Sequence, residues 1–197
     1  MALREEVQDI GERIAAHFQS GGEPPFILYQ YAPEAEWTVR RELGELRRWL
    51  EAPPRAIACA SISLADLFWR AVEESGYLDE LVASEREATA ASDDAAMREV
   101  HEAVGEILRQ PPTLPDRVVD EVAGCHERTA VFLYRAGALY PAYRTSTMLD
   151  DLRGRLPRPV TLLYPGRLVG EYGLSFMDRT EPAYGYRALI VPREAQA

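Results

Sequence analysis

The segment from Thr129 to Arg167 places the strongest constraint on what this chain can fold into. Two short apolar runs, Ala130–Tyr134 and Val160–Tyr164, bracket about one helix's length of chain, roughly Ala142 to Leu156. Short β-branched and aromatic runs flanked by Gly or Pro are typical of buried strands. Because a strand, a helix and a strand in succession form a crossover, the sequence predicts that the two strands are parallel neighbours.

Three further strands are predicted outside this unit, at residues 26–31, 56 to about 62, and 186–191. Helix-spaced apolar residues separate them, and residues 77–124 carry helix signals without a strand signal. At 197 residues the chain is expected to be one domain, 1–197, with 77–124 as a helical insertion. The predicted fold class is α/β, a three-layer sandwich with a mostly parallel sheet of about five strands. The last strand could be antiparallel at an edge.

Two local signals refine this outline. Ser63 follows the second predicted strand and has Asp66 three residues on, which predicts a helix N-cap with a capping box. The segment from Val169 to Tyr184 is expected to be a loop, in which Leu174 and Phe176 anchor the chain to the sheet.

Charge and composition exclude several classes of function. All 22 basic residues are arginine, so no Schiff-base lysine and no Walker A lysine is present. The net charge of −10 is uneven, because residues 1–124 hold 25 acids against 12 arginines and residues 125–193 hold 6 against 10. Direct nucleic-acid binding is not expected of so acidic a chain, since phosphate neutralisation drives such binding. The basic C-terminal part is compatible with an acidic partner or a local phosphate contact.

No pattern in the sequence indicates a catalytic residue, a metal site or a cofactor. The chain has no GxGxxG, GxxxxGK[ST] or GxSxG motif, and its three histidines lack ligand spacing. Cys59 and Cys125 are both expected to be buried structural thiols. No apolar run reaches the roughly 18 residues of a membrane helix. The acidic, amphipathic N-terminus resembles neither a secretory signal nor a transit peptide, so a cytoplasmic location is expected.

The polar, glycine and proline residues that follow the strands are the candidates for binding a partner or a ligand. In open α/β sheets, ligands dock beyond the carboxyl ends of the strands. The candidates are Arg40, Gly137, Tyr140, Pro141, Arg144, Pro165, Gly166 and Arg187. Arg144 precedes a helix start and could hold a phosphate or carboxylate with the first-turn amides. The alternatives are a structural or interface role for the arginines, and turn chemistry for the Tyr-Pro and Tyr-Pro-Gly sequences.

Several of these residues also carry a resemblance to a known family. GALYPAYRTSTMLDDL, then PVTLLYPG, then GYRALIV resemble the BrxB family, a small component of the BREX bacteriophage-exclusion systems of bacteria and archaea. The matching positions are Gly137, Tyr140, Pro141 and Arg144, then Tyr164, Pro165 and Gly166, then Tyr186, Arg187 and Ala188. The opening PFILYQYAP and the Val39-Arg40 pair are also similar to that family.

The resemblance implies a non-catalytic subunit of an anti-phage defence that methylates host DNA and blocks phage DNA replication. The family has no established enzymatic activity. Its members are encoded beside a PglZ-like protein of the phosphatase fold, a BrxC-like ATPase and a PglX-like methyltransferase, which are therefore the expected partners. Two hypotheses follow. The chain is an adaptor that binds these components, or it is a degenerate nucleotide- or phosphate-binding domain with a regulatory or enzymatic role.

Overall fold

The computed structural model describes residues 3–185 and 188–194, which form seven α-helices and six strands. The strands are β1 (Phe26–Tyr31), β2 (Ala58–Ser63), β3 (Thr129–Tyr134), β4 (Val160–Val169), β5 (Gly173–Phe176) and β6 (Leu189–Pro192). The α-helices are α1 (Glu5–Ser20), α2 (Glu36–Glu51), α3 (Leu64–Ser75), α4 (Leu78–Ala91), α5 (Asp94–Arg109), α6 (Leu114–Ala123) and α7 (Thr145–Leu152). Two short 3₁₀ helices, η1 (Pro33–Ala35) and η2 (Ala136–Leu139), follow β1 and β3.

Five strands pair in the order β2-β3-β4-β1-β6, and all of these pairs are parallel. β4 lies at the centre, where Val160 is level with Phe26 of β1 and with Val131 of β3. The second half of β4 runs on beyond the sheet and pairs antiparallel with β5, which places Gly166 opposite Phe176. The crossover predicted from β3 through a helix to β4 is thus confirmed.

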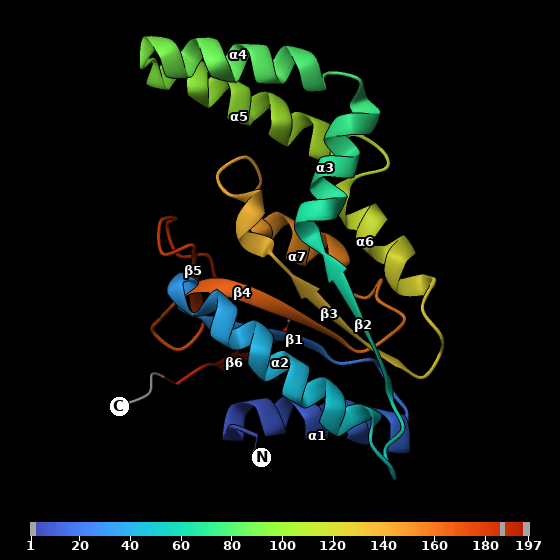
Figure 1. Ribbon diagram of the computed structural model, residues 1–197. Helices are drawn as coiled ribbons and strands as arrows, with labels where there is room; N and C mark the ends of the chain where they lie inside the picture. The colour runs from blue at the N-terminus through green and yellow to red at the C-terminus, as the bar shows by residue number, and fades with distance from the viewer. Residues whose placement is uncertain (1–2, 186–187, 195–197) are drawn as a thin grey trace.

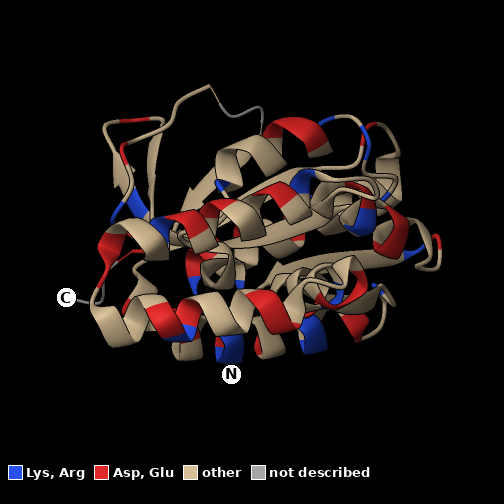
Figure 2. Ribbon diagram, turned by 90° about the horizontal axis from the view of Figure 1, so that it is seen from above, with Lys and Arg blue, Asp and Glu red and all other residues tan. Residues whose placement is uncertain are grey.

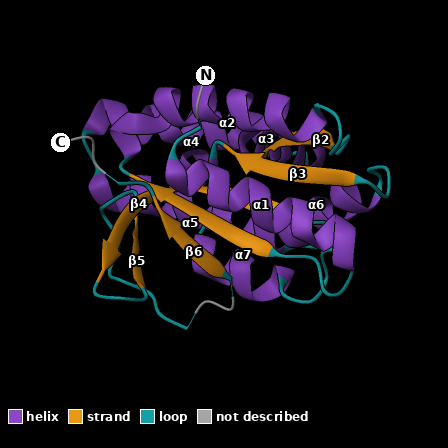
Figure 3. Ribbon diagram, turned by 90° about the horizontal axis from the view of Figure 1, so that it is seen from below, coloured by secondary structure: helices purple, strands orange, loops and turns teal. Residues whose placement is uncertain are grey.

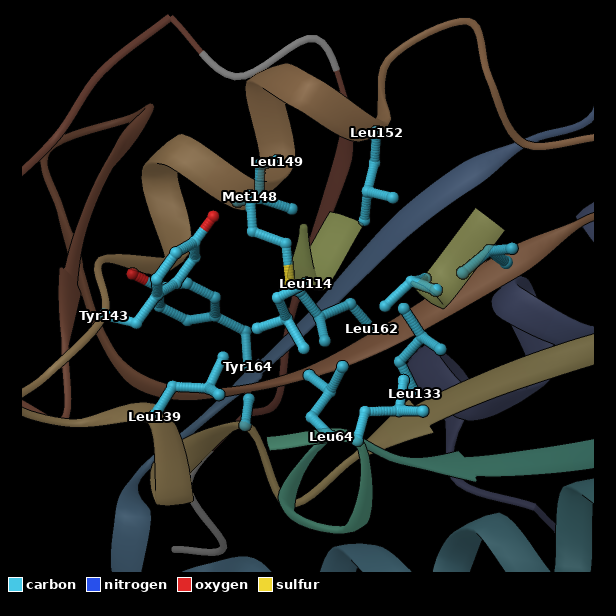
Figure 4. Packing of buried hydrophobic residues seen from close by; sticks show 14 of the residues in the cluster. Leu64, Leu114, Leu133, Leu139, Tyr143, Met148, Leu149, Leu152, Leu162 and Tyr164 are labelled. Atoms are coloured by element: carbon cyan, nitrogen blue, oxygen red, sulfur yellow. The ribbon is translucent and has the colours of Figure 1, made fainter. Parts of the chain in front are cut away.

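Helices cover both faces of the sheet, which confirms the three-layer α/β sandwich (Figures 1 and 3). On one face, α1 and α2 pack residues such as Ile10 and Leu46 against Tyr29 and Phe132. On the other face, α3, α6 and α7 pack against residues such as Leu133 and Leu162 (Figure 4). Both clusters are fully apolar at their centres, which supplies the main driving force for folding. The alternation of side chains along each strand divides the apolar residues between the two faces.

The helical segment between β2 and β3 divides into two parts. α6 belongs to the sandwich, because Leu114, Val118 and Val122 are buried in the core beneath it. α4 and α5 form a hairpin that packs on α3 and extends away from the sheet (Figure 1). Few of its residues are buried: Ala88 in α4, and Gly105 and Leu108 in α5. The hairpin therefore presents most of its surface to solvent.

The predicted strands differ from the observed ones chiefly at their ends. β2 begins at Ala58, two residues later than predicted, and β4 continues to Val169. The last strand begins at Leu189 and is parallel to β1, so the antiparallel alternative is wrong. Tyr186, predicted as its first residue, lies outside the described residues.

The segment between β4 and β6 was predicted as a loop, and this is wrong in part, because it contains β5. The anchoring role of Leu174 and Phe176 is confirmed, since they are 1% and 3% exposed. The helix of the crossover is also shorter than predicted. α7 spans Thr145–Leu152 and ends two residues before Gly154, which adopts a left-handed φ of 66°.

The cap of α3 is confirmed, but its capping box is not seen. Ser63 Oγ accepts the amide of Asp66 at 3.2 Å. The Asp66 carboxylate forms an ion pair with Arg135 at 3.2 Å. Asp66 thus links the start of α3 to the end of β3, a long-range contact that a local motif does not reveal.

Candidate functional site

The residues that follow β3, β4 and β1 lie at one edge of the sheet. β3, β4 and β1 are adjacent and parallel, so their carboxyl ends lie side by side. After β1 the chain enters η1 and α2 on one face, whereas after β3 it enters η2, which packs on the opposite face. Connections that leave toward opposite faces open a crevice between them, which is where ligands bind in open α/β sheets. The predicted site residues are concentrated at this edge.

The first opening at this edge, here named the Trp37 crevice, has a volume of about 550 Å³. It is lined by Pro33, Glu36, Trp37, Arg40, Arg135, Gly137, Ala138, Pro165 and Met177. These residues come from η1 and α2, from the start of η2, and from the β4–β5 hairpin. The crevice therefore depends on the pairing of β1, β3 and β4.

Arg40 lines the Trp37 crevice and lies near two aromatic rings, of which only Trp37 lines the crevice as well. Its guanidinium carbon lies 5.0 Å from the ring centroid of Trp37 and 5.1 Å from that of Tyr134. Such cation–π contacts orient the guanidinium without neutralising its charge. Trp37 is 77% exposed and Arg40 is half-buried beneath it, so the ring is open to solvent. Among the described residues no carboxylate forms an ion pair with Arg40.

Arg135 supplies a second cation, and its backbone makes the turn out of β3. It adopts a left-handed φ of 60°, which directs the chain from the strand into η2. Its side chain forms the ion pair with Asp66, and both groups are about half exposed. An exposed pair of this kind contributes little to stability. The guanidinium of Arg135 thus stays available at the rim of the crevice.

Gly166 and Gly137 each lie where another part of the chain comes close to the glycine backbone. A Cβ atom on Gly166 would stand 2.1 Å from the carbonyl oxygen of Ser175 on the paired strand. The carbonyl of Gly166 also accepts a hydrogen bond of 2.7 Å from Gln30 Nε2, which is buried beneath it. A Cβ on Gly137 would meet Met177 Sδ at 3.1 Å. Gly166 therefore has a structural role in the hairpin, whereas Gly137 lines the crevice.

A second opening, here named the Tyr143 pocket, lies between the start of α7 and the β4–β5 hairpin, and it measures about 270 Å³. Its lining comprises Tyr140, Pro141, Tyr143, Arg144, Thr145, Ser146, Tyr164, Leu174, Phe176, Thr180, Glu181 and Ala183. The peptide bond between Tyr140 and Pro141 is cis. Tyr140 lies edge-on to Phe176, with the ring centroids 6.4 Å apart.

The structure thus divides the predicted site residues between two openings. Arg40, Gly137 and Pro165 line the Trp37 crevice. Tyr140, Pro141 and Arg144 line the Tyr143 pocket. Gly166 lines neither opening, and Arg187 lies outside the described residues.

Sequence reasoning missed several residues of both openings, and one of them carried a usable signal. Trp37 lies two residues before Val39, the first buried residue of α2. Two residues correspond to about 200° around a helix, which places Trp37 on the side away from the core. A tryptophan off the apolar stripe is a candidate for an exposed contact. No comparable signal marks Met177.

Sequence reasoning also missed a buried ion-pair network on the α1–α2 side. Arg193 donates to both carboxylate oxygens of Glu42, and the Tyr29 hydroxyl donates to Glu42 Oε2 at 3.2 Å. Burial, together with the Glu42 charge, raises the pKa of Tyr29 far above its ordinary value. Glu42 lies three residues after Val39 and four before Leu46, on the buried stripe of α2. A glutamate at an apolar stripe position is the signal that could have found this network.

The described residues give no sign of a metal centre or a reactive thiol. No group of three or more His, Cys, Asp or Glu side chains within them could hold a metal ion. Cys59 is buried, and burial raises the pKa of its thiol to about 12. Cys125 is half-buried, and burial raises its pKa as well. None of the helices in residues 3–185 and 188–194 is both long and apolar enough to cross a bilayer.

Comparison with known proteins gives a match to a protein-family model. The family model described as BREX protein BrxB matches residues 60–191. The match spans β2 to β6 and so includes both the α4–α5 hairpin and the Tyr143 pocket. No curated protein and no solved structure matches the chain. Because the family model covers more than half of the 197 residues, the chain belongs to the BrxB family of BREX components.

Proposed function

We propose that this chain is a non-catalytic binding subunit of a BREX anti-phage system, and that it binds another component through the Trp37 crevice. BrxB membership supports a role in BREX defence. The single observation that carries the binding role is the exposed Trp37 ring stacked on the half-buried Arg40 at the carboxyl edge of the sheet. Tryptophan, arginine and tyrosine are the residues that contribute most to binding energy in protein interfaces.

The chemistry of the crevice favours a partner with an acidic surface. Arg40 and Arg135 place two cations at its rim. Glu36, the carboxylate that also lines it, accepts a hydrogen bond from the Tyr31 hydroxyl, which turns the Glu36 carboxylate toward the protein. Trp37, Met177 and Pro165 add apolar contact area around the cations. A patch with an apolar centre and arginines matches the composition of interface cores.

The distribution of acidic residues over the chain is consistent with an acidic partner at the Trp37 crevice. Acidic positions recur on helices across the molecule (Figure 2). The α4–α5 hairpin alone, residues 78–109, holds nine acids against three arginines. It extends away from the sheet on α3 (Figure 1). Much of the negative charge of the chain is therefore placed away from the crevice, where it would otherwise repel an acidic partner.

The test is co-expression with the neighbouring BREX components, followed by size-exclusion chromatography and mass analysis of what co-elutes. The candidates are the PglZ-like phosphatase-fold protein, the BrxC-like ATPase and the PglX-like methyltransferase. The expected result is a stoichiometric complex with one of them. Trp37→Ala and Arg40→Glu are each expected to weaken that complex by about tenfold or more, as substitutions at an interface centre do.

Arg48→Glu is the matched control, since it makes the same charge change on α2 about 12 Å further along the helix. Each variant is checked for folding by its thermal transition. A complex that forms equally well with Arg40→Glu and Arg48→Glu contradicts the assigned surface. Elution of the chain alone in every co-expression contradicts the adaptor role itself.

A further inference from the structure

We propose that the Tyr143 pocket binds a small organic anion, whose phosphate or carboxylate group is held by Tyr143, Arg144 and Thr145. This inference is independent of the binding role of the Trp37 crevice, because Tyr143, Arg144 and Thr145 line only the Tyr143 pocket. It rests on two buried residues whose hydroxyls have no hydrogen-bond partner among the described residues, on an uncapped helix start and on an apolar lining.

Two hydroxyl-bearing side chains in the pocket are almost completely buried and have no hydrogen-bond partner among the described residues. Thr145 is 1% exposed and Tyr143 is 3% exposed, and both line the pocket. Neither hydroxyl oxygen is among the fully buried unpartnered atoms of the described residues, so a ligand in the pocket that accepts a hydrogen bond could reach them. In Figure 4 the Tyr143 hydroxyl points away from the leucine cluster below it. Burial raises the pKa of Tyr143 to about 12, so its hydroxyl remains a donor at neutral pH.

The same wall of the pocket is the N-terminus of α7. Arg144 is the N-cap residue, and no side chain caps the helix. The first amides of a helix have no partner within it and carry a partial positive charge, which favours an anion. The exposed Arg144 guanidinium, which no ion pair within the described residues engages, adds a full positive charge. The Thr145 hydroxyl, the first amides of α7 and the Arg144 guanidinium thus supply hydrogen-bond donors on one wall of the pocket.

The rest of the lining indicates what the anion is attached to. Leu174, Phe176 and Ala183 form an apolar wall contributed by the β5 segment. The volume of about 270 Å³ equals roughly nine water molecules at about 30 Å³ each, which exceeds what a bare oxyanion fills. Glu181 also lines the pocket. Its carboxylate repels a second negative group, so the anionic end of the ligand is placed on the α7 side.

The experiment measures the thermal transition of the full chain against increasing concentrations of four organic anions: phenyl phosphate, glycerol 3-phosphate, benzoate and hexanoate. Phenol tests the contribution of the apolar part of the ligand, and inorganic phosphate tests the contribution of its charged group. The expected result is a saturable rise in Tm with at least one organic anion, because a ligand that binds only the folded state stabilises it. Phenol is expected to give no shift, and inorganic phosphate a weaker one than its organic esters.

Thr145→Val and Tyr143→Phe each remove one hydroxyl while keeping the shape of the side chain. Each is expected to weaken binding of the active anion by about tenfold, the usual scale for a hydrogen bond to a charged group. Thr147→Val, at an exposed position of α7 outside the pocket, is expected to bind normally. Trp37→Ala is also expected to bind normally.

Three results would contradict the assignment. One is the absence of a saturable shift with all four organic anions up to about 10 mM, a concentration at which even a millimolar ligand stabilises measurably. Another is a shift that Thr145→Val and Tyr143→Phe, both folded, leave unchanged. A rise in Tm with inorganic phosphate as large as that with its esters would show that the organic part of the ligand does not contribute to binding.

Discussion

The guanidinium of Arg193 and the carboxylate of Glu42 form a two-point ion pair between the end of the last strand and the second helix. Nη2 donates to Oε1 at 2.9 Å and Nε donates to Oε2 at 3.0 Å. Their side chains are only 12% and 10% exposed. Arg4, at the start of α1, approaches the same carboxylate at 3.9 Å. Together with Tyr29, whose hydroxyl donates to Glu42 Oε2, residues at the start of α1, in β1 and at the end of β6 therefore meet at Glu42 on α2.

Breaking this pair is expected to destabilise the fold. Arg193→Met removes the cation and leaves a buried carboxylate, which lowers the free energy of unfolding by about 3 kcal/mol. Urea unfolding at neutral pH measures the loss. Arg13→Met is the control, because its ion pair with Asp9 on α1 is about half exposed and contributes less than about 1 kcal/mol. Equal losses in the two variants would contradict the buried character of the Glu42 pair.

The capping box of α6 predicts a pH dependence of stability. Hydrogen bonds from Arg155 and from Thr113 hold the pKa of Asp116 below its ordinary value. Because the folded pKa is lower than the unfolded one, this contribution is present above the unfolded pKa of about 3.9 and is lost as the pH falls through the folded pKa.

Asp116→Asn is therefore expected to be less stable than the wild type at pH 6, with a difference that shrinks below about pH 4. Urea unfolding curves across that range give the difference. Asp120→Asn, at an exposed position of the same helix, should track the wild type at every pH. A difference in stability between Asp116→Asn and the wild type that persists at low pH would show that the negative charge of Asp116 is not its cause.

Two glycines are expected to respond to the same substitution with opposite signs. Gly166→Ala would place a Cβ 2.1 Å from the Ser175 carbonyl oxygen, so the hairpin must shift, at a cost of about 2 kcal/mol. Gly44→Ala, on an exposed position of α2 with nothing within 4 Å, gains helix propensity of about 1 kcal/mol. Thermal or urea unfolding distinguishes them, and a neutral Gly166→Ala would contradict the close approach of β4 and β5.

The buried thiol of Cys59 is expected to be unreactive in the folded chain. With a pKa raised to about 12, only about 10⁻⁴ of the group is thiolate at pH 8, and burial restricts access as well. Titration with a disulfide reagent should therefore modify Cys125 first, since that residue is half-buried. In urea both thiols should react. Rapid modification of Cys59 in a Cys125→Ser variant under native conditions would contradict its burial.

The predictions that succeeded rest on short-range patterns. The apolar runs of β1, β3 and β4 identified those strands, and the β3–α7–β4 crossover identified parallel pairing. Ser63 was recognised as a cap because the signal lies within one helical turn. Local conformation and side-chain periodicity fix such features, so neighbouring residues are sufficient to reveal them.

The site required the tertiary structure. Arg40 and Pro165 line the same opening because β1 pairs with β4. The strand order β2-β3-β4-β1-β6 cannot be read from any one segment of the sequence. β5 was missed because it forms only against the overrun of β4, and the Glu42–Arg193 pair joins positions 151 residues apart. The sequence alone established the α/β class and the edge where the candidates lie. Long-range packing decided which of them share an opening, since pairing energies between distant segments leave no local pattern.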